Sequence, residues 1–96
     1  GEREIRKYLE AEKIKFIPQH RFKDCRDKKP LPFDFYLPEH NICIEFDGEQ
    51  HFKEKEQWGG IEGLIDRQRK DKIKTEYCET KKIRLIRVTN IKDLKI

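Results

Sequence analysis

Apolar and polar residues alternate in two neighbouring stretches near the middle of the chain. Every second residue is apolar in FDFYL, residues 33–37, and again in ICIEFD, residues 42–47. A period of two is the spacing of a strand that buries one face and leaves the other to solvent. Four turn-forming residues, PEHN, separate the two stretches. The pattern therefore predicts an antiparallel hairpin whose polar face carries Asp34, Glu45 and Asp47.

The flanking sequence predicts two helices and two further strands. Residues 2–14 and 61–82 place apolar side chains three and four positions apart among charged ones, which is the spacing of amphipathic helices. Residues 15–22 predict a short strand, which Pro18 restricts to a sheet edge or a bulge. Residues 83–88, IRLIRV, alternate apolar and basic residues and predict another strand.

The order of these elements indicates the fold class. Loops are expected over residues 23–32 and 49–63, and residues 90–96 are expected to begin a further helix. Helix, strand, hairpin, helix and strand in succession are typical of an α/β domain. We therefore expect a small mixed β-sheet, in which a central antiparallel hairpin joins further strands, flanked by helices. The chain of 96 residues forms one domain, residues 1–96.

Charge changes this picture because it is distributed unevenly. The net charge is +4, yet residues 30–61 hold seven Asp and Glu against two Lys and Arg. Residues 1–29 hold ten Lys and Arg against six acids, and residues 62–96 hold eleven against six. Basic flanks around an acidic centre are expected of a polyanion-binding protein with an acidic active site. Ordinary solvated surface charge is the equally simple alternative.

Cysteine usage and hydropathy limit the cellular setting. Cys25, Cys43 and Cys78 are odd in number and lack CxxC spacing, which favours reduced thiols in the cytoplasm. The same spacing disfavours the alternative of a zinc-stabilised interaction domain. No apolar run approaches the roughly 20 residues that span a bilayer, so no membrane partner is expected. Because the sequence lacks Met, we expect the domain to be excised from a longer chain.

The three hairpin acids suggest a metal site. Asp34, Glu45 and Asp47 on one face would repel one another, and like charges on facing strands are destabilising. A divalent cation removes that repulsion, and carboxylate oxygens suit Mg²⁺ or Mn²⁺. A solvated acidic face is the alternative interpretation.

Three residues outside the hairpin are candidates for the same chemistry. His51 follows Asp47 by four positions, and its ordinary pKa suits it to accept a proton from water. An isolated histidine would be interpreted as a surface residue, but the three neighbouring carboxylates favour the functional interpretation. Glu2 lies on the apolar side of the first helix, whereas Glu4 lies on its flank, and the pattern leaves the choice between them open. Asp71 stands among basic residues, where helix-surface ion pairs are expected.

These pieces together resemble a known nuclease superfamily. A helix with GE..I...L, a strand pair with FDFYLP…ICIEFDGEQH and a helix with RKDKIK..YC…IRLIRV follow one another from residue 1 to about residue 88. In order and spacing they resemble the PD-(D/E)xK nucleases, and within these the very short patch repair endonucleases. The most similar branch comprises phage and intron-encoded homing endonucleases with an E-D-x-H-D signature. The resemblance implies a restriction-endonuclease-like fold.

The resemblance also implies roles for individual residues. The E-D-x-H-D signature falls on Glu2, Asp34, His51 and Asp71. Glu45 and Asp47 occupy the (D/E)xK element, with Asp47 where the superfamily has lysine. Water would then be activated by the histidine, by the metal ion or by a lysine from elsewhere, for which the candidates are Lys53, Lys70 and Lys72. Phosphate contacts are expected from the second helix, through Arg67, Arg69, Lys70, Lys72 and Lys74.

The implied function is that of a Mg²⁺- or Mn²⁺-dependent endonuclease acting on double-stranded DNA. It would be the catalytic domain of a homing endonuclease from a mobile intron or phage, acting in the cytoplasm of a bacterial or phage-infected cell. A separate N-terminal DNA-binding region would supply site recognition, and a homodimer on the DNA would supply two active sites. The zinc site and aromatic wedge of the repair enzymes are absent from the sequence. Alternatives are a repair nickase, a restriction-type or RNA nuclease, and a non-catalytic nucleic-acid-binding module.

Overall fold

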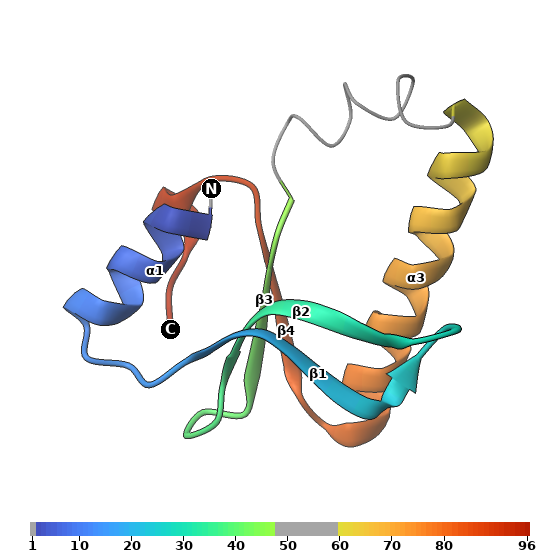
Figure 1. Cartoon of the computed structure of the whole chain (residues 1–96). Helices are drawn as coiled ribbons and strands as arrows, with labels where there is room; N and C mark the ends of the chain where they lie inside the picture. Colours follow the sequence, from blue (N-terminus) through green and yellow to red (C-terminus); the bar gives the residue numbers. More distant parts are fainter. Residues whose placement is uncertain (1, 48–59) are drawn as a thin grey trace.

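The computed structural model describes residues 2–47 and 60–96 of the chain (Figure 1). In chain order the elements are α1 (Glu2–Ala11), β1 (Ile17–Arg26), β2 (Pro30–Leu37), β3 (Ile42–Phe46), α3 (Gly60–Lys81), β4 (Arg84–Val88) and the short 3-10 helix η1 (Ile91–Asp93). The expected small α/β domain with a mixed sheet and two flanking helices is thereby confirmed. No helix within these ranges is both long and apolar enough to cross a membrane.

The four strands form one sheet in the order β1-β2-β3-β4. Strands β1, β2 and β3 pair antiparallel, so the predicted hairpin is present, with Phe35 opposite Ile44 and Leu37 opposite Ile42. Strand β4 pairs parallel to β3, which places Glu45 opposite Arg87. Parallel neighbours need a long crossover, and α3 lies within that connection.

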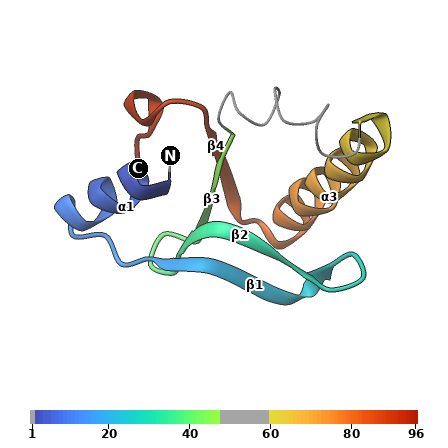
Figure 2. The same ribbon diagram turned by 45° about the horizontal axis from the view of Figure 1, so that its top comes forward.

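Helices α1 and α3 cover opposite faces of this sheet (Figures 1 and 2). Under α1, Ile5 and Leu9 pack on Phe35 and Ile44 in one core cluster. A second cluster lies on the α3 side and joins the three cysteines with two apolar residues, Phe33 and Ile83. A domain of this size can bury both faces of its central strand only by using both helices.

Burial on both faces corrects the expectation of a polar hairpin face. Cys43 is fully buried and Glu45 is 7% exposed, because α3 covers the side of β3 that the alternation assigned to solvent. Phe33 was expected beside Phe35, yet it packs on the α3 side. It lies beyond Phe35–Ile44, the last pair between β2 and β3, although β1 still pairs with it through His20.

The predicted loop at residues 23–32 is largely strand. Strand β1 continues to Arg26 and β2 begins at Pro30, with a bulge in their pairing. Proline is tolerated here because Pro30 and Pro32 pair with β1 only, and β3 does not pair with this part of β2. At the C-terminus, the expected helix is limited to η1, where the Asn90 side chain accepts a hydrogen bond from the Lys92 N–H.

Candidate functional site

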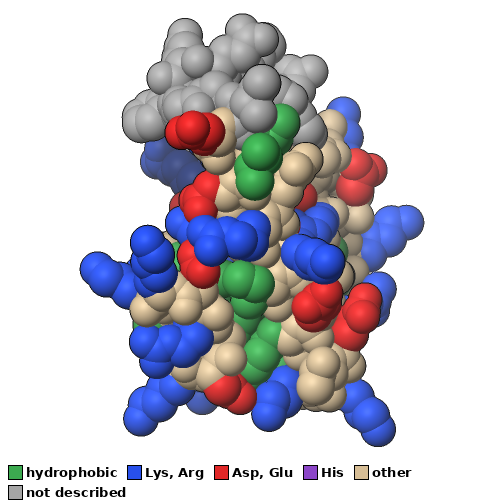
Figure 3. Space-filling model, turned by 90° about the vertical axis from the view of Figure 1, so that its right-hand side faces the viewer, with side chains coloured by type: hydrophobic (Ala, Val, Ile, Leu, Met, Phe, Trp, Pro, Cys, Tyr) green, Lys and Arg blue, Asp and Glu red, His purple; other side chains and the backbone are tan. Residues whose placement is uncertain are grey.

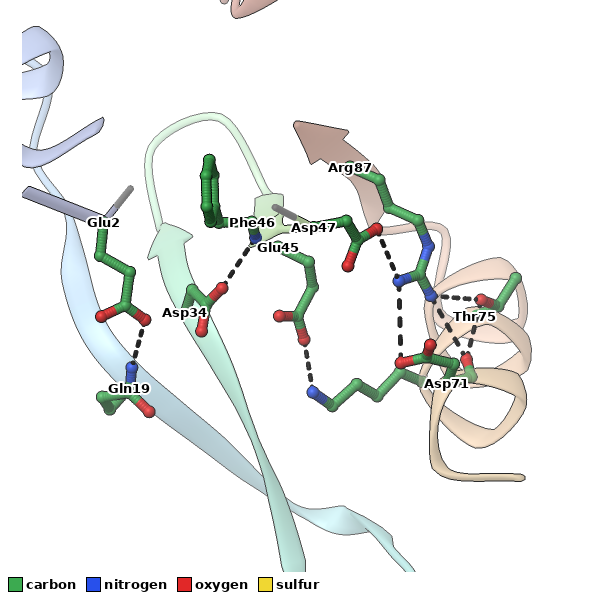
Figure 4. A network of polar contacts seen from close by, with 10 residues as sticks. Glu2, Gln19, Asp34, Glu45, Phe46, Asp47, Asp71, Thr75 and Arg87 are labelled. Atoms are coloured by element: carbon green, nitrogen blue, oxygen red, sulfur yellow. Dashed lines mark hydrogen bonds and ion pairs between the residues drawn. The ribbon is translucent and has the colours of Figure 1, made fainter. Parts of the chain in front are cut away.

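The candidate site begins where β2 and β3 separate. Asp34 is the first residue of β2 beyond the last pair between the two strands. Its carboxylate accepts a hydrogen bond of 2.7 Å from the Phe46 N–H (Figure 4). The side chain thus takes the place of the backbone acceptor that continued pairing of β2 with β3 would supply. Backbone donors in the interior of a fold need such a partner. The sheet itself therefore fixes the position of the Asp34 carboxylate.

We call the point where β2 and β3 separate the fork. It opens into a cleft of about 400 Å³ between the sheet and α3. Its lining is Glu2, Pro32, Asp34, Glu45, Phe46, Asp47, Arg67, Lys70, Asp71 and Lys74. Five acids and three bases give a formal charge of 3 − 5 = −2 on a protein with net charge +4. The predicted acids are thus brought together from α1, β2, the end of β3, and α3. The predicted histidine, His51, lies outside the described residues.

One face of α3 supplies the far wall of the cleft. Arg67, Lys70, Asp71 and Lys74 follow one another at intervals of three, one and three residues, so they share a helix face. The other two basic residues expected to contact phosphate point elsewhere. Arg69 contacts Asp27 and Asp66, and Lys72 lies 3.9 Å from Glu76.

Glu45 and Lys74 form a nearly buried ion pair inside this cleft. Their side chains are 9% and 13% exposed, and the Lys74 ammonium also lies 5.3 Å from the centre of the Phe33 ring. Burial raises the pKa of Glu45 to about 7, and the charge of Asp34 adds to this, while Lys74 opposes it. Lys74 was predicted only as a phosphate contact. Its spacing of three from Asp71 was the signal that it shares the site.

Glu2 completes the acidic side of the cleft. Interaction with the Asp34 carboxylate, followed by burial, raises the pKa of Glu2. Gln19 partly offsets this, because its Nε2 donates a 3.0 Å hydrogen bond to Glu2 Oε1 (Figure 4). Gln19 has a φ of +50°, an uncommon backbone conformation for a residue within a strand. No sequence pattern indicated Gln19. Glu4 does not line the cleft, which favours Glu2 as the acid of the first helix.

Arg87 on β4 contacts two of the predicted site acids, Asp47 and Asp71. Its Nη1 lies 3.6 Å from Asp47 Oδ2 and 3.8 Å from Asp71 Oδ1, and its Nη2 donates a 3.0 Å hydrogen bond to the Thr75 hydroxyl. One guanidinium therefore offsets the charge of two predicted site acids and joins β4 to α3 (Figure 4). Arg87 was not predicted as a site residue, because an alternating strand pattern indicates which face a residue occupies but not its cross-strand neighbours. Parallel pairing with β3 places it opposite Glu45.

Potential metal ligands are present but are not gathered closely. Among residues 2–47 and 60–96, no three side chains of His, Cys, Asp or Glu lie together in an arrangement that could hold a metal ion. This includes Cys25, Cys43 and Cys78, which share the core cluster under α3 and are free thiols. Burial raises the pKa of Cys25 to about 11, consistent with an unreactive core thiol. The zinc-stabilised alternative gains no support from the described residues.

Comparison with family models, curated protein sequences and solved structures found no match to this chain. The resemblance to PD-(D/E)xK nucleases therefore rests on the order and spacing of its own residues. What the structure adds is the spatial grouping of Glu2, Asp34 and Glu45 beside Lys74 in one cleft.

Proposed function

We propose that this chain is a metal-dependent DNA endonuclease domain with the restriction-endonuclease-like fold of the very short patch repair branch. The observation that carries the proposal is the convergence of Asp34, Glu45 and Lys74 in one cleft. Superfamily members place an acid and a lysine two positions apart on one strand, and this chain has Asp47 at the lysine position. Lys74 from α3 supplies an ammonium beside Glu45 instead.

The cleft fits Mg²⁺ in its donor chemistry and charge. Its formal charge of −2 matches a divalent ion. Interaction with Asp34 is the largest cause of the raised pKa of Glu2, and it adds to the effect of burial in raising the pKa of Glu45. Mg²⁺ keeps several waters and commonly takes only one or two carboxylates together with substrate phosphate. Asp34 and Glu45 would hold it, since the Asp47 carboxylate faces Arg87. Bound there, Mg²⁺ supplies Lewis-acid stabilisation of the charge that develops on the phosphate.

The side chains of this protein would supply the other functions that phosphodiester hydrolysis needs. Lys74 holds its ammonium on Glu45, where it orients the attacking water and stabilises negative charge next to the scissile phosphate. His51 is the proposed proton acceptor. Arg87 holds Asp47 and Asp71 in place as a positioning residue. Arg67 and Lys70, on the cleft face of α3, contact the DNA backbone.

The principal competing function is non-catalytic nucleic-acid binding. Phosphate binding alone favours bases on a surface, whereas Glu45 and Lys74 are nearly buried. Such a pair often contributes less to stability than apolar residues of the same volume would. Its presence at the fork is therefore better accounted for by catalysis. Within nucleases, a homing-type domain is preferred over a repair nickase because the sequence lacks the zinc site and aromatic wedge of the repair enzymes. A restriction-type nuclease of the same fold is the other alternative.

Cleavage of supercoiled plasmid tests this function. We expect nicking or linearisation with Mg²⁺ or Mn²⁺ that stops with EDTA. Asp34→Asn and Lys74→Met should each lower the rate by about 10²- to 10⁴-fold, because each removes a group at the reacting phosphate. The matched controls are Asp93→Asn and Lys92→Met, both at exposed positions of η1. A linear product formed without a nicked precursor would indicate a homodimer on the DNA.

Two results would count against the proposal. If folded wild-type protein leaves plasmid intact with either metal ion, the chain is a binding module. If Asp34→Asn and Lys74→Met cut as fast as their controls, the cleavage arises elsewhere or from a contaminant. Thermal unfolding of each variant shows whether lost activity reflects lost structure.

A further inference from the structure

A second hollow lies beside the acidic cleft, between α3 and the turn that joins β1 to β2. It is lined by Arg21, Asp27, Lys28, Lys29, Pro30, Leu31, Pro32, Asp66, Arg69 and Lys70. Figures 1 and 2 show this turn reaching from the sheet towards α3. Five bases and two acids give the hollow a formal charge of 5 − 2 = +3, opposite in sign to the neighbouring cleft.

The two acids of this hollow are already engaged. Arg69 Nη1 lies 2.9 Å from Asp27 Oδ1, and its Nη2 contacts Asp66, which also lies 3.1 Å from the Lys70 ammonium. Arg69 therefore ties the turn to the helix, and its charge is offset by both acids. We call this contact the Arg69 bridge.

The lysines of the turn are left available. Lys28 and Lys29 are exposed, and neither ammonium has an ion-pair partner among the described residues. Arg21 is held at the base of the turn by a 2.6 Å hydrogen bond from its Nη1 to the Pro30 carbonyl. Figure 3 views the molecule from the α3 side, where Lys and Arg side chains are spread over the surface.

The two hollows adjoin. Pro32 and Lys70 line both of them, so an extended anion in the basic hollow would lie next to the cleft that holds the acids of the fork. A small anion would need a closed site with a buried polar anchor, whereas this hollow is open and its charges are spread along the turn and the helix. An extended polyanion is the partner that fits such a surface.

We propose that this hollow is a phosphate track, in which Lys28 and Lys29 contact the DNA phosphates that flank the scissile one. The Arg69 bridge positions the turn for this contact. The inference rests on the proposed function, because the adjoining cleft is taken to hold the scissile phosphate. It adds the β1–β2 turn to the DNA surface, for which the sequence predicted contacts from the second helix.

Salt-dependent binding to a labelled DNA duplex tests the track. We compare Lys28→Ala/Lys29→Ala with the matched control Lys92→Ala/Lys95→Ala, which removes two exposed lysines near the C-terminus, beside α1. All proteins carry Asp34→Asn and are measured in EDTA, so cleavage does not interfere. Two lost phosphate contacts should reduce the slope of log K against log salt by about 1.8 for duplex DNA. A single-stranded probe should show a smaller reduction, about 1.4.

The outcomes separate the track from the nuclease activity, because plasmid cleavage is measured in parallel with Asp34 restored. A lower slope for the turn variant alone supports the track, whether or not the protein cleaves. Equal slopes for turn variant, control and parent overturn the track, and cleavage by wild type then leaves the proposed function intact. Absence of DNA binding by the parent overturns the track, and the cleavage assay alone then decides the proposed function.

Discussion

Burial controls the ionisation of Glu45 more strongly than its ion pair does. The carboxylate lies on a central strand with α3 above it, and loss of solvation is the largest influence on its pKa. The contact with Lys74 acts in the opposite direction and does not restore an ordinary value. With a pKa of about 7, Glu45 is near its midpoint at neutral pH. A cation bound at the fork would favour its ionised form.

Glu45→Gln should therefore change how stability depends on pH. Between pH 4.5 and 7 the folded protein holds the Glu45 proton more tightly than the unfolded chain does. The free energy of unfolding of wild type should fall as pH rises through this window, by up to about 3 kcal/mol from this group. The variant lacks that titration. Urea unfolding at several pH values in EDTA, with exposed Glu79→Gln as control, measures the difference.

The sign of this effect is the decisive observation. Stability of Glu45→Gln relative to wild type should rise from pH 4.5 to 7 and stay constant above. Parallel curves for wild type and variant would mean that folding leaves the pKa of Glu45 at its ordinary value, and the account of burial as the dominant influence on that pKa would then be wrong.

The two halves of α3 are held to the rest of the domain by different kinds of contact. Its C-terminal half packs into the core through Ile73, Tyr77 and Cys78. In residues 62–72 no side chain is buried, and Ile65 is 57% exposed. Charged contacts such as the Arg69 bridge hold this half, which also carries Arg67 and Lys70 into the cleft. The C-terminal half of the helix is thus held by apolar packing, and the N-terminal half by charged contacts at its surface.

Arg69→Ala should loosen the N-terminal half of α3 without unfolding the domain. We expect amide exchange in residues 62–70 to become a few-fold faster, roughly as expected for local opening, while exchange in residues 73–81 is unchanged. Hydrogen exchange followed by mass spectrometry measures both segments. Lys72→Ala, which removes only an exposed pair with Glu76, is the control. Equal acceleration along the whole helix would show that α3 behaves as one rigid unit.

The local sequence pattern predicted most of the helices and strands, but not which faces of the sheet the helices cover. The hairpin and both helices follow from periodicity, which depends only on neighbours in sequence. The loop expected over 23–32 was wrong because pairing with β1 overrides the turn preference of Pro30 and Pro32. The acids at the fork were predicted as a group. Their partners Gln19, Lys74 and Arg87 were not, since each comes from an element that is distant in sequence and meets the site only after folding.

For the whole molecule, the separation of charge predicts an effect of Mg²⁺ that needs no DNA. Mg²⁺ that binds only the folded protein stabilises it by about 2.7 kcal/mol at 100 times its Kd. For a domain of this size that corresponds to roughly 10 °C or more in Tm. Asp34→Asn/Glu45→Gln should abolish the increase, because it removes both proposed ligands. Thermal scans in MgCl₂ and in NaCl of equal ionic strength separate binding from screening, which matters for a protein of net charge +4. An equal rise in wild type and the double variant would place any Mg²⁺ binding outside the fork, and the catalytic role of Asp34 would then have to be explained without a metal ligand.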